Sequence, residues 1–162
     1  MKDFVDAHIE LWRDEQEGID ARVEGIAVRM QVLVRHLDRQ REAALSAHNL
    51  PHWGFKTLHM LRRGGAPYRA TPGELAKHLS LSPATLTSRL DAMERAGYLR
   101  RDHDRDDRRR VLVTLTREGH KIWERTIEDQ QKVEQDLIRH LPAKDQDLLN
   151  NLLRRLVLAT DA

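Results

Sequence analysis

Small polar side chains are concentrated on one face of the helix predicted over residues 83–96. Ser82 can cap this helix, because its hydroxyl can accept from a free backbone amide of the first turn. Leu86, Leu90 and Met93 recur at spacings of four and three, so they predict the buried face. The opposite face has no bulky residue, and its hydroxyl groups can reach base edges or phosphates in a DNA major groove. The predicted DNA contacts on this helix are Ser82, Ala84, Thr85, Thr87, Ser88 and, on the flank, Arg89.

A second group of candidate residues lies in the charged loop DHDRDDRRR at residues 102–110. Its arginines are nearly balanced by aspartates, and a carboxylate can hold a guanidinium through paired hydrogen bonds. An arginine fixed in this way can enter a narrow, A·T-rich minor groove. A solvated hairpin tip has a similar composition, but the helices and strands around the loop favour a DNA contact. The predicted contacts are Arg105, Arg108 and Arg109.

The elements around these residues have the order of a helix-turn-helix followed by a hairpin. The run TPGE has the residue types of a capping box and predicts a short helix over residues 72–78. Few residues separate it from the next helix, which ends at Gly97. Alternating apolar residues then predict strands over 98–102 and 111–115, with the charged loop between them.

Longer helices are predicted on both sides of this segment, over residues 3–16, 20–47, 52–63 and 116–140, with a last helix after Pro142. In the helix over 20–47, apolar residues three or four apart predict one buried face, made of Val23, Ile26, Ala27, Met30, Leu33, Val34, Leu37 and, after a gap, Ala44 and Leu45. The last helix has a similar apolar face, made of Leu148, Leu149, Leu152, Leu153, Leu156 and Val157. The predicted fold class is mainly α, an α+β winged helix-turn-helix with a small β-hairpin wing and long terminal helices.

The amino-acid composition excludes several classes of protein but does not identify a binding partner. The 162-residue chain has 28 basic and 26 acidic residues, so its formal net charge of +2 does not by itself indicate nucleic-acid binding. The absence of cysteine excludes disulfides and thiol redox sensing. The N-terminus has no apolar run typical of a secretory signal, and no segment has the apolar length of a membrane span. We expect a cytoplasmic protein that has no membrane partner and no cofactor.

The stretch over residues 71–119 resembles the winged-helix signature of the MarR family. It has the family's D-x-x-D-x-R pattern at Asp104, Asp107 and Arg109, and its L-T-x-x-G pattern at residues 115–119. The resemblance implies a transcriptional regulator, by default a repressor, that binds double-stranded DNA as a homodimer. The operator is then a pseudo-palindrome whose half-sites lie about 34–36 Å apart, one helical turn.

The resemblance also implies a division of the chain into three parts. Residues 1–50 hold the N-terminal helices, for dimerisation and a possible ligand pocket. Residues 51–116 form the winged helix-turn-helix DNA-binding domain, and residues 117–162 form the C-terminal dimerisation helices.

A small effector molecule is a further implication of the resemblance. Family members commonly bind a small, often aromatic anion that releases them from DNA, and the N-terminal helix with Trp12 resembles a urate-responsive subgroup. Arg89 matches a recognition-helix arginine of that subgroup, whereas Lys56 stands where the subgroup has an acid. The resemblance therefore implies ligand contacts from Trp12, Lys56 and Arg89, and the lysine favours a more anionic ligand such as a carboxylate.

Other classes of function have weaker support in the sequence. The chain has nine histidines without a tight metal-ligand spacing, so a metal-responsive regulator of the same fold is an alternative and no metal ligand is assigned. Phosphate-binding glycine loops, nucleophile elbows and paired catalytic carboxylates are not found, so we expect no enzyme. A helical dimer whose wing contacts protein is a third alternative. Steep salt dependence of DNA binding distinguishes a regulator from that alternative.

Overall fold

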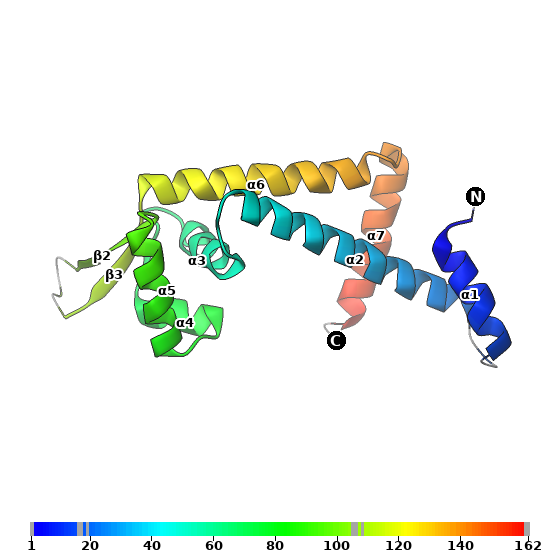
Figure 1. Ribbon diagram of the computed structural model, residues 1–162, viewed down its shortest axis with the longest axis horizontal. Helices are drawn as coiled ribbons and strands as arrows, with labels where there is room; N and C mark the ends of the chain where they lie inside the picture. Colours follow the sequence, from blue (N-terminus) through cyan, green and yellow to red (C-terminus); the bar gives the residue numbers. More distant parts are fainter. Residues whose placement is uncertain (1, 16–17, 19, 105–106, 108, 161–162) are drawn as a thin grey trace. The chain divides into compact units, whose positions relative to one another are not determined.

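The computed structural model describes residues 2–15, 18, 20–104, 107 and 109–160. The described elements are, in order, α1 (Phe4–Glu15), α2 (Ala21–Ala47), α3 (His52–Arg63), β1 (Arg69–Ala70), α4 (Pro72–Leu79), α5 (Pro83–Arg95), β2 (Leu99–His103), β3 (Val111–Leu115), α6 (Arg117–Ile138) and α7 (Ala143–Thr160) (Figure 1). The mainly helical winged helix-turn-helix fold predicted from the sequence is confirmed. Every helix within these ranges is too short or too polar to cross a membrane.

The chain divides into two compact units, residues 1–42 and residues 43–162. In the first unit, α1 packs on α2 through Val5 and Ile9, which are both buried. Gly25 on α2 lies against the end of the Ile9 side chain, so the absence of a side chain at this position lets the isoleucine approach the α2 backbone.

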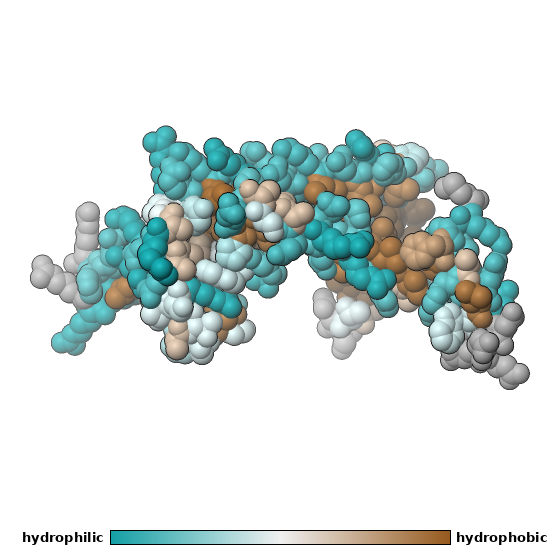
Figure 2. Space-filling view, viewed as in Figure 1, coloured by the Kyte–Doolittle hydropathy of each residue, from teal (hydrophilic) through white to brown (hydrophobic). Residues whose placement is uncertain are grey.

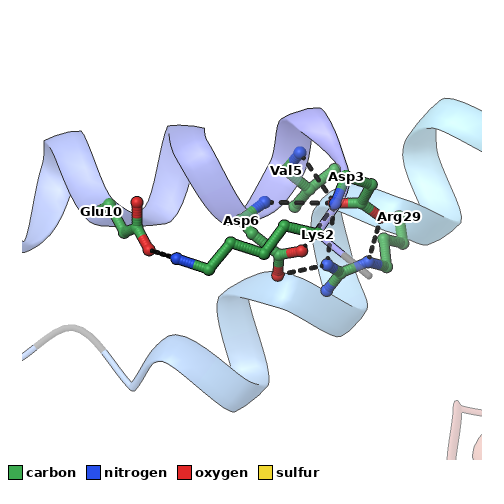
Figure 3. Close-up of polar contacts among 6 residues, drawn as sticks. All are labelled: Lys2, Asp3, Val5, Asp6, Glu10 and Arg29. Carbon is green, nitrogen blue, oxygen red and sulfur yellow. Dashed lines mark hydrogen bonds and ion pairs between the residues drawn. The ribbon is translucent and has the colours of Figure 1, made fainter.

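An ion-pair cluster fixes α1 to α2 near the start of the chain (Figure 3). The Arg29 guanidinium donates to both Asp3 carboxylate oxygens at 2.9 Å and to Asp6 Oδ1 at 2.7 Å. These hydrogen bonds from Arg29 lower the pKa of Asp3 to about 2 and also lower the pKa of Asp6, where the Asp3 backbone amide contributes most. Because these groups are exposed to solvent, we regard the cluster as an orienting contact between the two helices.

The hydrophobic core of the second unit lies among α3, α4, α5 and the sheet. The last turn of α2 contributes Leu45, and the remaining core residues are Leu50, Leu58, Leu61, Leu75, Leu86, Leu90, Met93, Leu99, Val113 and Leu115. The buried positions predicted for α5, namely Leu86, Leu90 and Met93, are all confirmed. This core supports α5 from one side and leaves its other side exposed.

The sheet has three antiparallel strands in the order β1–β3–β2. Leu99 pairs with Leu115 across the hairpin, and Arg69 of β1 pairs with Thr114 on the other edge of β3. The sequence did not predict β1, which has two residues and therefore no alternation to detect. It also predicted β2 one residue too early, because Tyr98 still lies in the turn that ends α5, where its backbone amide donates to the Met93 carbonyl.

The ends of the two short helices follow the predicted capping chemistry. Thr71 and Glu74 form the complete capping box at the start of α4, and the Ser82 hydroxyl accepts from the Thr85 amide at the start of α5. After α5, Gly97 has a φ of +76°, and the amides of Gly97 and Tyr98 donate back to the helix. This left-handed ending turns the chain directly into β2.

The apolar face predicted to be buried on α2 is largely exposed in the single chain over residues 23–34, so this part of the prediction is corrected, whereas Leu45 is buried as predicted. Val23 and Val34 are 62% and 56% exposed, and Figure 2 shows hydrophobic side chains at the surface along α2. The apolar face of α7 is exposed in the same way, as are Phe4 and Trp12 on α1. The periodicity identified apolar faces correctly, but periodicity alone cannot say whether the same chain covers them.

Candidate nucleic-acid interface

The second helix of the helix-turn-helix, α5, presents small polar residues to solvent. Four of the six DNA contacts predicted for this helix lie exposed on its first two turns, and they are Ala84, Thr85, Thr87 and Ser88. Ser82 is also exposed, at the helix N-cap. The helix therefore offers a face without bulk to a groove, while its opposite face is fixed in the core.

The hydroxyl groups on this face differ in the hydrogen bonds that they have left to make. Ser82 Oγ accepts from the Thr85 amide at 3.2 Å and lies 2.8 Å from Thr85 Oγ1, so these two hydroxyls already serve the helix cap. Thr87 Oγ1 donates to the Pro83 carbonyl at 2.9 Å, and its oxygen remains an acceptor. An acceptor at this position suits the amino groups of cytosine or adenine in the major groove.

The wing continues from α5 through the β2–β3 hairpin, which extends away from the helices of its unit (Figure 1). Arg109 is exposed in the hairpin loop, and its backbone amide donates to Asp107 Oδ1 at 3.0 Å. Backbone hydrogen bonds from Asp104 to Arg110 and from Arg110 to Asp107 close the same turn. Asp107 therefore orders the backbone of the loop that carries Arg109, a role that the sequence did not predict. The predicted contacts Arg105 and Arg108 lie outside the described residues.

An ion-pair cluster connects α5 to the wing. The Arg101 guanidinium on β2 donates to Glu94 Oε2 from both Nε, at 2.8 Å, and Nη2, at 2.5 Å, and it also lies 2.7 Å from Asp91 Oδ1. The Arg101 backbone amide donates to Glu94 Oε1 at 2.8 Å. These hydrogen bonds from Arg101 hold the pKa of Glu94 below its ordinary value. The cluster joins the exposed helix to the hairpin, so it fixes the two candidate DNA contacts relative to each other.

The same junction is packed against the start of α6. The Thr116 hydroxyl donates to the Gly97 carbonyl at 2.6 Å and accepts from the Gly119 amide at 3.0 Å. A Cβ atom on Gly119 would lie 2.0 Å from the Tyr98 carbonyl oxygen, so only glycine allows this approach. Helix α6 is thereby docked on the residues that link α5 to β2.

Comparison with known proteins identifies the family to which this chain belongs. The family model described as MarR family matches residues 54–111, from α3 to the start of β3. The chain is also 35% identical to the HTH-type transcriptional regulator PecS of Dickeya dadantii, over 91% of this chain and 89% of that protein. The chain belongs to the MarR family.

Solved structures agree with this MarR-family assignment. The YusO protein of Bacillus subtilis has the same fold, with a TM-score of 0.79 over 88% of this chain and 99% of that one, at 18% identity. A mutant of MarR from E. coli, C80S, crystallised with operator DNA, is 29% identical over 83% of this chain and 95% of its own. Its TM-score is 0.58.

The residues that the MarR resemblance associated with a ligand lie on three helices, α1, α3 and α5. Arg89 is half-buried and points its guanidinium over the Trp53 ring on α3, 5.4 Å from the ring centre, so it lies on the flank of α5. Lys56 is exposed on α3, three residues after Trp53 and so on a neighbouring part of that helix surface. Trp12 belongs to the first unit, where it is partly exposed and 6.1 Å from the His8 ring.

Sequence reasoning missed Arg101, and it named Asp107 only as part of the wing pattern, without its role in ordering the loop backbone. Strand alternation places Arg101 on the same face as the buried Leu99, and a charged residue at such a position signals an internal ion pair. Among the residues that the structure describes, no group of three or more histidine or acidic side chains is arranged to hold a metal ion.

Proposed function

We propose that this MarR-family chain is a sequence-specific DNA-binding transcriptional regulator, acting as a homodimeric repressor. The exposed face of α5 carries the proposal, because it is polar, lacks bulky side chains and is held rigidly against a hydrophobic core beside the hairpin. On this proposal, α5 enters the major groove and Arg109 contacts the adjacent minor groove or backbone. The E. coli MarR mutant crystallised with operator DNA, 29% identical to this chain, supports such a partner.

The homodimer follows from the apolar faces that a single chain leaves exposed. On α7, Leu152, Leu156 and Val157 are 45%, 50% and 57% exposed, which is costly for a soluble surface unless a partner covers it. We assign residues 117–162 and residues 1–50 to dimerisation, and residues 51–116 to DNA binding. A two-fold dimer presents two copies of α5, so the operator is a pseudo-palindrome.

The salt dependence of DNA binding tests the proposal. Fluorescence anisotropy with DNA from the adjacent intergenic region should give an affinity that falls steeply as salt rises, because each neutralised phosphate releases counterions. Unrelated DNA of the same length should bind far more weakly. A flat salt response, or equal affinity for both duplexes, would favour the alternative in which the wing contacts protein.

We propose in addition that a small organic anion reduces DNA affinity. The Arg89 guanidinium on α5 lies over the Trp53 ring, and Lys56 is exposed three residues after Trp53 on α3, so a second cation belongs to the same part of the α3 surface. A carboxylate attached to an aromatic ring suits this combination of charge and surface. The predicted contribution of Trp12 remains a prediction, as does regulation by a metal.

A panel of aromatic carboxylates, added to the protein–DNA complex, tests this second proposal. An effector should weaken DNA binding by about 5- to 150-fold, the usual range for coupled sites. Lys56→Glu should abolish the response while leaving DNA binding without effector intact, because Lys56 is exposed on α3 and is not among the predicted DNA contacts. If none of the compounds changes DNA affinity or thermal stability, the effector proposal is wrong.

A further inference from the structure

Arg62, in the last turn of α3, is enclosed by side chains from three parts of the second unit. Its guanidinium lies 4.7 Å from the centre of the Trp123 ring on α6 and 5.3 Å from the centre of the Tyr68 ring, just before β1. Its Nη2 atom lies 3.1 Å from Glu124 Oε1, also on α6. Trp123 is held in turn by its contact with the His59 ring of α3.

The remaining partner of Arg62 is His120, and the chemistry of the pair fixes the state of the imidazole. Arg62 Nη1 lies 2.7 Å from His120 Nδ1. A guanidinium has only donors and stays protonated, so Nδ1 must accept, and His120 is neutral with its proton on Nε2. A protonated His120 would place two donors and two positive charges in contact.

The groups around His120 reinforce the neutral form. Burial lowers the pKa of His120, and the charge of Arg62 on α3 lowers it further, whereas Glu124 on α6 acts in the opposite direction. Tyr68, from the segment before β1, packs its ring edge-on against the imidazole, with the centres 4.6 Å apart. In the described part of the chain, the titratable groups in contact with the Arg62–His120 pair are Tyr68, which lies against both side chains, and Glu124, which accepts from Arg62.

Tyr68 connects this cluster to the base of the wing. Its backbone carbonyl accepts from the Leu115 amide at 3.0 Å, and β1 begins at the next residue and pairs with β3. Tyr68 also has a φ of +57°, a conformation that a bulky side chain adopts only where its surroundings hold it. Its ring contacts with Arg62 and His120 supply such surroundings.

We propose that Arg62 is a positioning residue for the wing, and that it holds Tyr68 and β1 in place only while His120 is neutral. Protonation of His120 expels the guanidinium, frees Tyr68 and loosens the sheet edge that supports the hairpin. The inference rests on the proposed DNA-binding function, because the wing is taken to contact DNA. It predicts that acid weakens DNA binding, whereas an added positive charge alone would strengthen it.

DNA affinity measured against pH tests the proposal in the full-length chain. Between pH 8 and pH 5 at constant ionic strength, wild-type affinity should fall below pH 6.5, and by about 5- to 150-fold once the pH is below the lowered pKa of His120. His120→Gln removes the titration and keeps an acceptor for Arg62, so its affinity should change little with pH. His52→Gln, which alters an exposed histidine at the start of α3, should behave as wild type. A His120→Gln profile that follows wild type would overturn the proposal.

Nuclear magnetic resonance of the imidazole nitrogens provides a readout that needs neither DNA nor a folded variant. In wild type at pH 7.5, His120 Nδ1 should be unprotonated and Nε2 protonated, and the reverse tautomer would contradict the inference. Arg62→Gln should raise the pKa of His120 toward its ordinary value, because the repelling charge is gone. If wild type bound no DNA at any pH, the proposed function would fail, while the tautomer would still decide the Arg62–His120 contact.

Discussion

At the scale of single residues, the candidate interface consists of side chains whose own backbones are held in place. Ser82 and Thr85 share their hydroxyl groups with the start of α5, and Asp107 orders the loop that carries Arg109. Many polar side chains in this region therefore hold the local backbone in place, and fewer of them are left to hydrogen-bond to a partner. Arg109 and Thr87 are among the side chains that can still hydrogen-bond to a partner.

Replacement of Arg109 by alanine tests the wing contact. Arg109→Ala should weaken binding to an A·T-flanked operator by about 1–3 kcal/mol, as expected for one lost DNA contact. The slope of log affinity against log salt concentration should become shallower by about one, as expected for one lost phosphate contact. Thermal stability should be unchanged, because Arg109 is exposed. Unchanged affinity in an anisotropy titration would remove Arg109 from the interface.

The Arg101–Glu94 contact gives a prediction about stability and pH. Arg101→Gln should reduce the free energy of unfolding at pH 7 by about 1–2 kcal/mol, because it breaks charged hydrogen bonds that are only partly shielded from solvent. Since the contact lowers the pKa of Glu94 below 4.5 in the folded state, the stabilisation is complete above that pH and is lost as pH falls through the lowered value.

Urea denaturation at pH 7 and pH 3.5 measures this difference. Arg100→Gln is the matched control, because Arg100 lies next to Arg101 on the opposite face of β2 and is 62% exposed. Its effect should be below about 0.5 kcal/mol at both pH values. A difference between wild type and Arg101→Gln that does not shrink in acid would show that Glu94 is not the partner that matters.

At the scale of elements, the junction of α5, β2 and α6 decides how the hairpin is held. Thr116 caps α6 and also contacts the Gly97 carbonyl, and Gly119 lets the first turn of α6 approach the Tyr98 backbone. Three elements therefore meet without an intervening side chain. A small shift at this junction would move the wing relative to α5.

Two glycine substitutions distinguish the steric effect of this close approach from the general effect of replacing a helical glycine by alanine. Gly119→Ala should destabilise the fold by about 1–3 kcal/mol or more, because its Cβ would overlap a backbone carbonyl. Gly73→Ala on α4 has open space around its Cβ and should be neutral or stabilise by up to about 1 kcal/mol. Chemical denaturation of both variants checks the pair, and equal effects would rule out a close contact at Gly119.

The sequence predicts these elements well where local chemistry determines them. Caps at Thr71, Ser82 and Thr116 mark helix starts because each uses a hydroxyl within the next turn. Strand β1, the contact of Arg101 with Glu94 and the position of Arg62 against His120 depend on elements distant in sequence, so no local pattern predicts them. The exposed face of α5 follows from periodicity, but the rotation of Arg89 toward Trp53 needs the packing of α3 on α5.

At the scale of the whole molecule, the exposed apolar faces of α2 and α7 are the observation that supports the proposed homodimer. Apolar side chains at three- and four-residue spacings form one continuous face on a helix, which is typical of a surface that packs against a partner. Isolated apolar residues on an ordinary surface do not show this regular spacing. In the proposed dimer, each chain supplies one copy of α5 for one half-site, and the two-fold symmetry supplies the copy for the other half-site.

A charge placed on the apolar face of α7 tests the dimer. Leu152→Glu should convert the protein to a monomer and reduce operator affinity by at least tenfold, because one recognition helix then binds alone and a buried charge is costly at an apolar interface. Asn150→Glu, which adds the same charge at an exposed polar position of α7, should remain dimeric. Light scattering during size-exclusion chromatography gives the mass of each, and a dimeric Leu152→Glu would place the interface elsewhere.

The most direct test of the central claim is a hydroxyl-radical footprint of the wild-type protein on a genomic fragment that it selects. The DNA-binding account predicts protection in two half-sites whose centres lie about 34–36 Å apart, with flanking minor-groove protection that Arg109→Ala removes. Uniform protection without half-sites, or no protection at concentrations where the protein is dimeric, would contradict the assignment of α5 and the wing to DNA recognition.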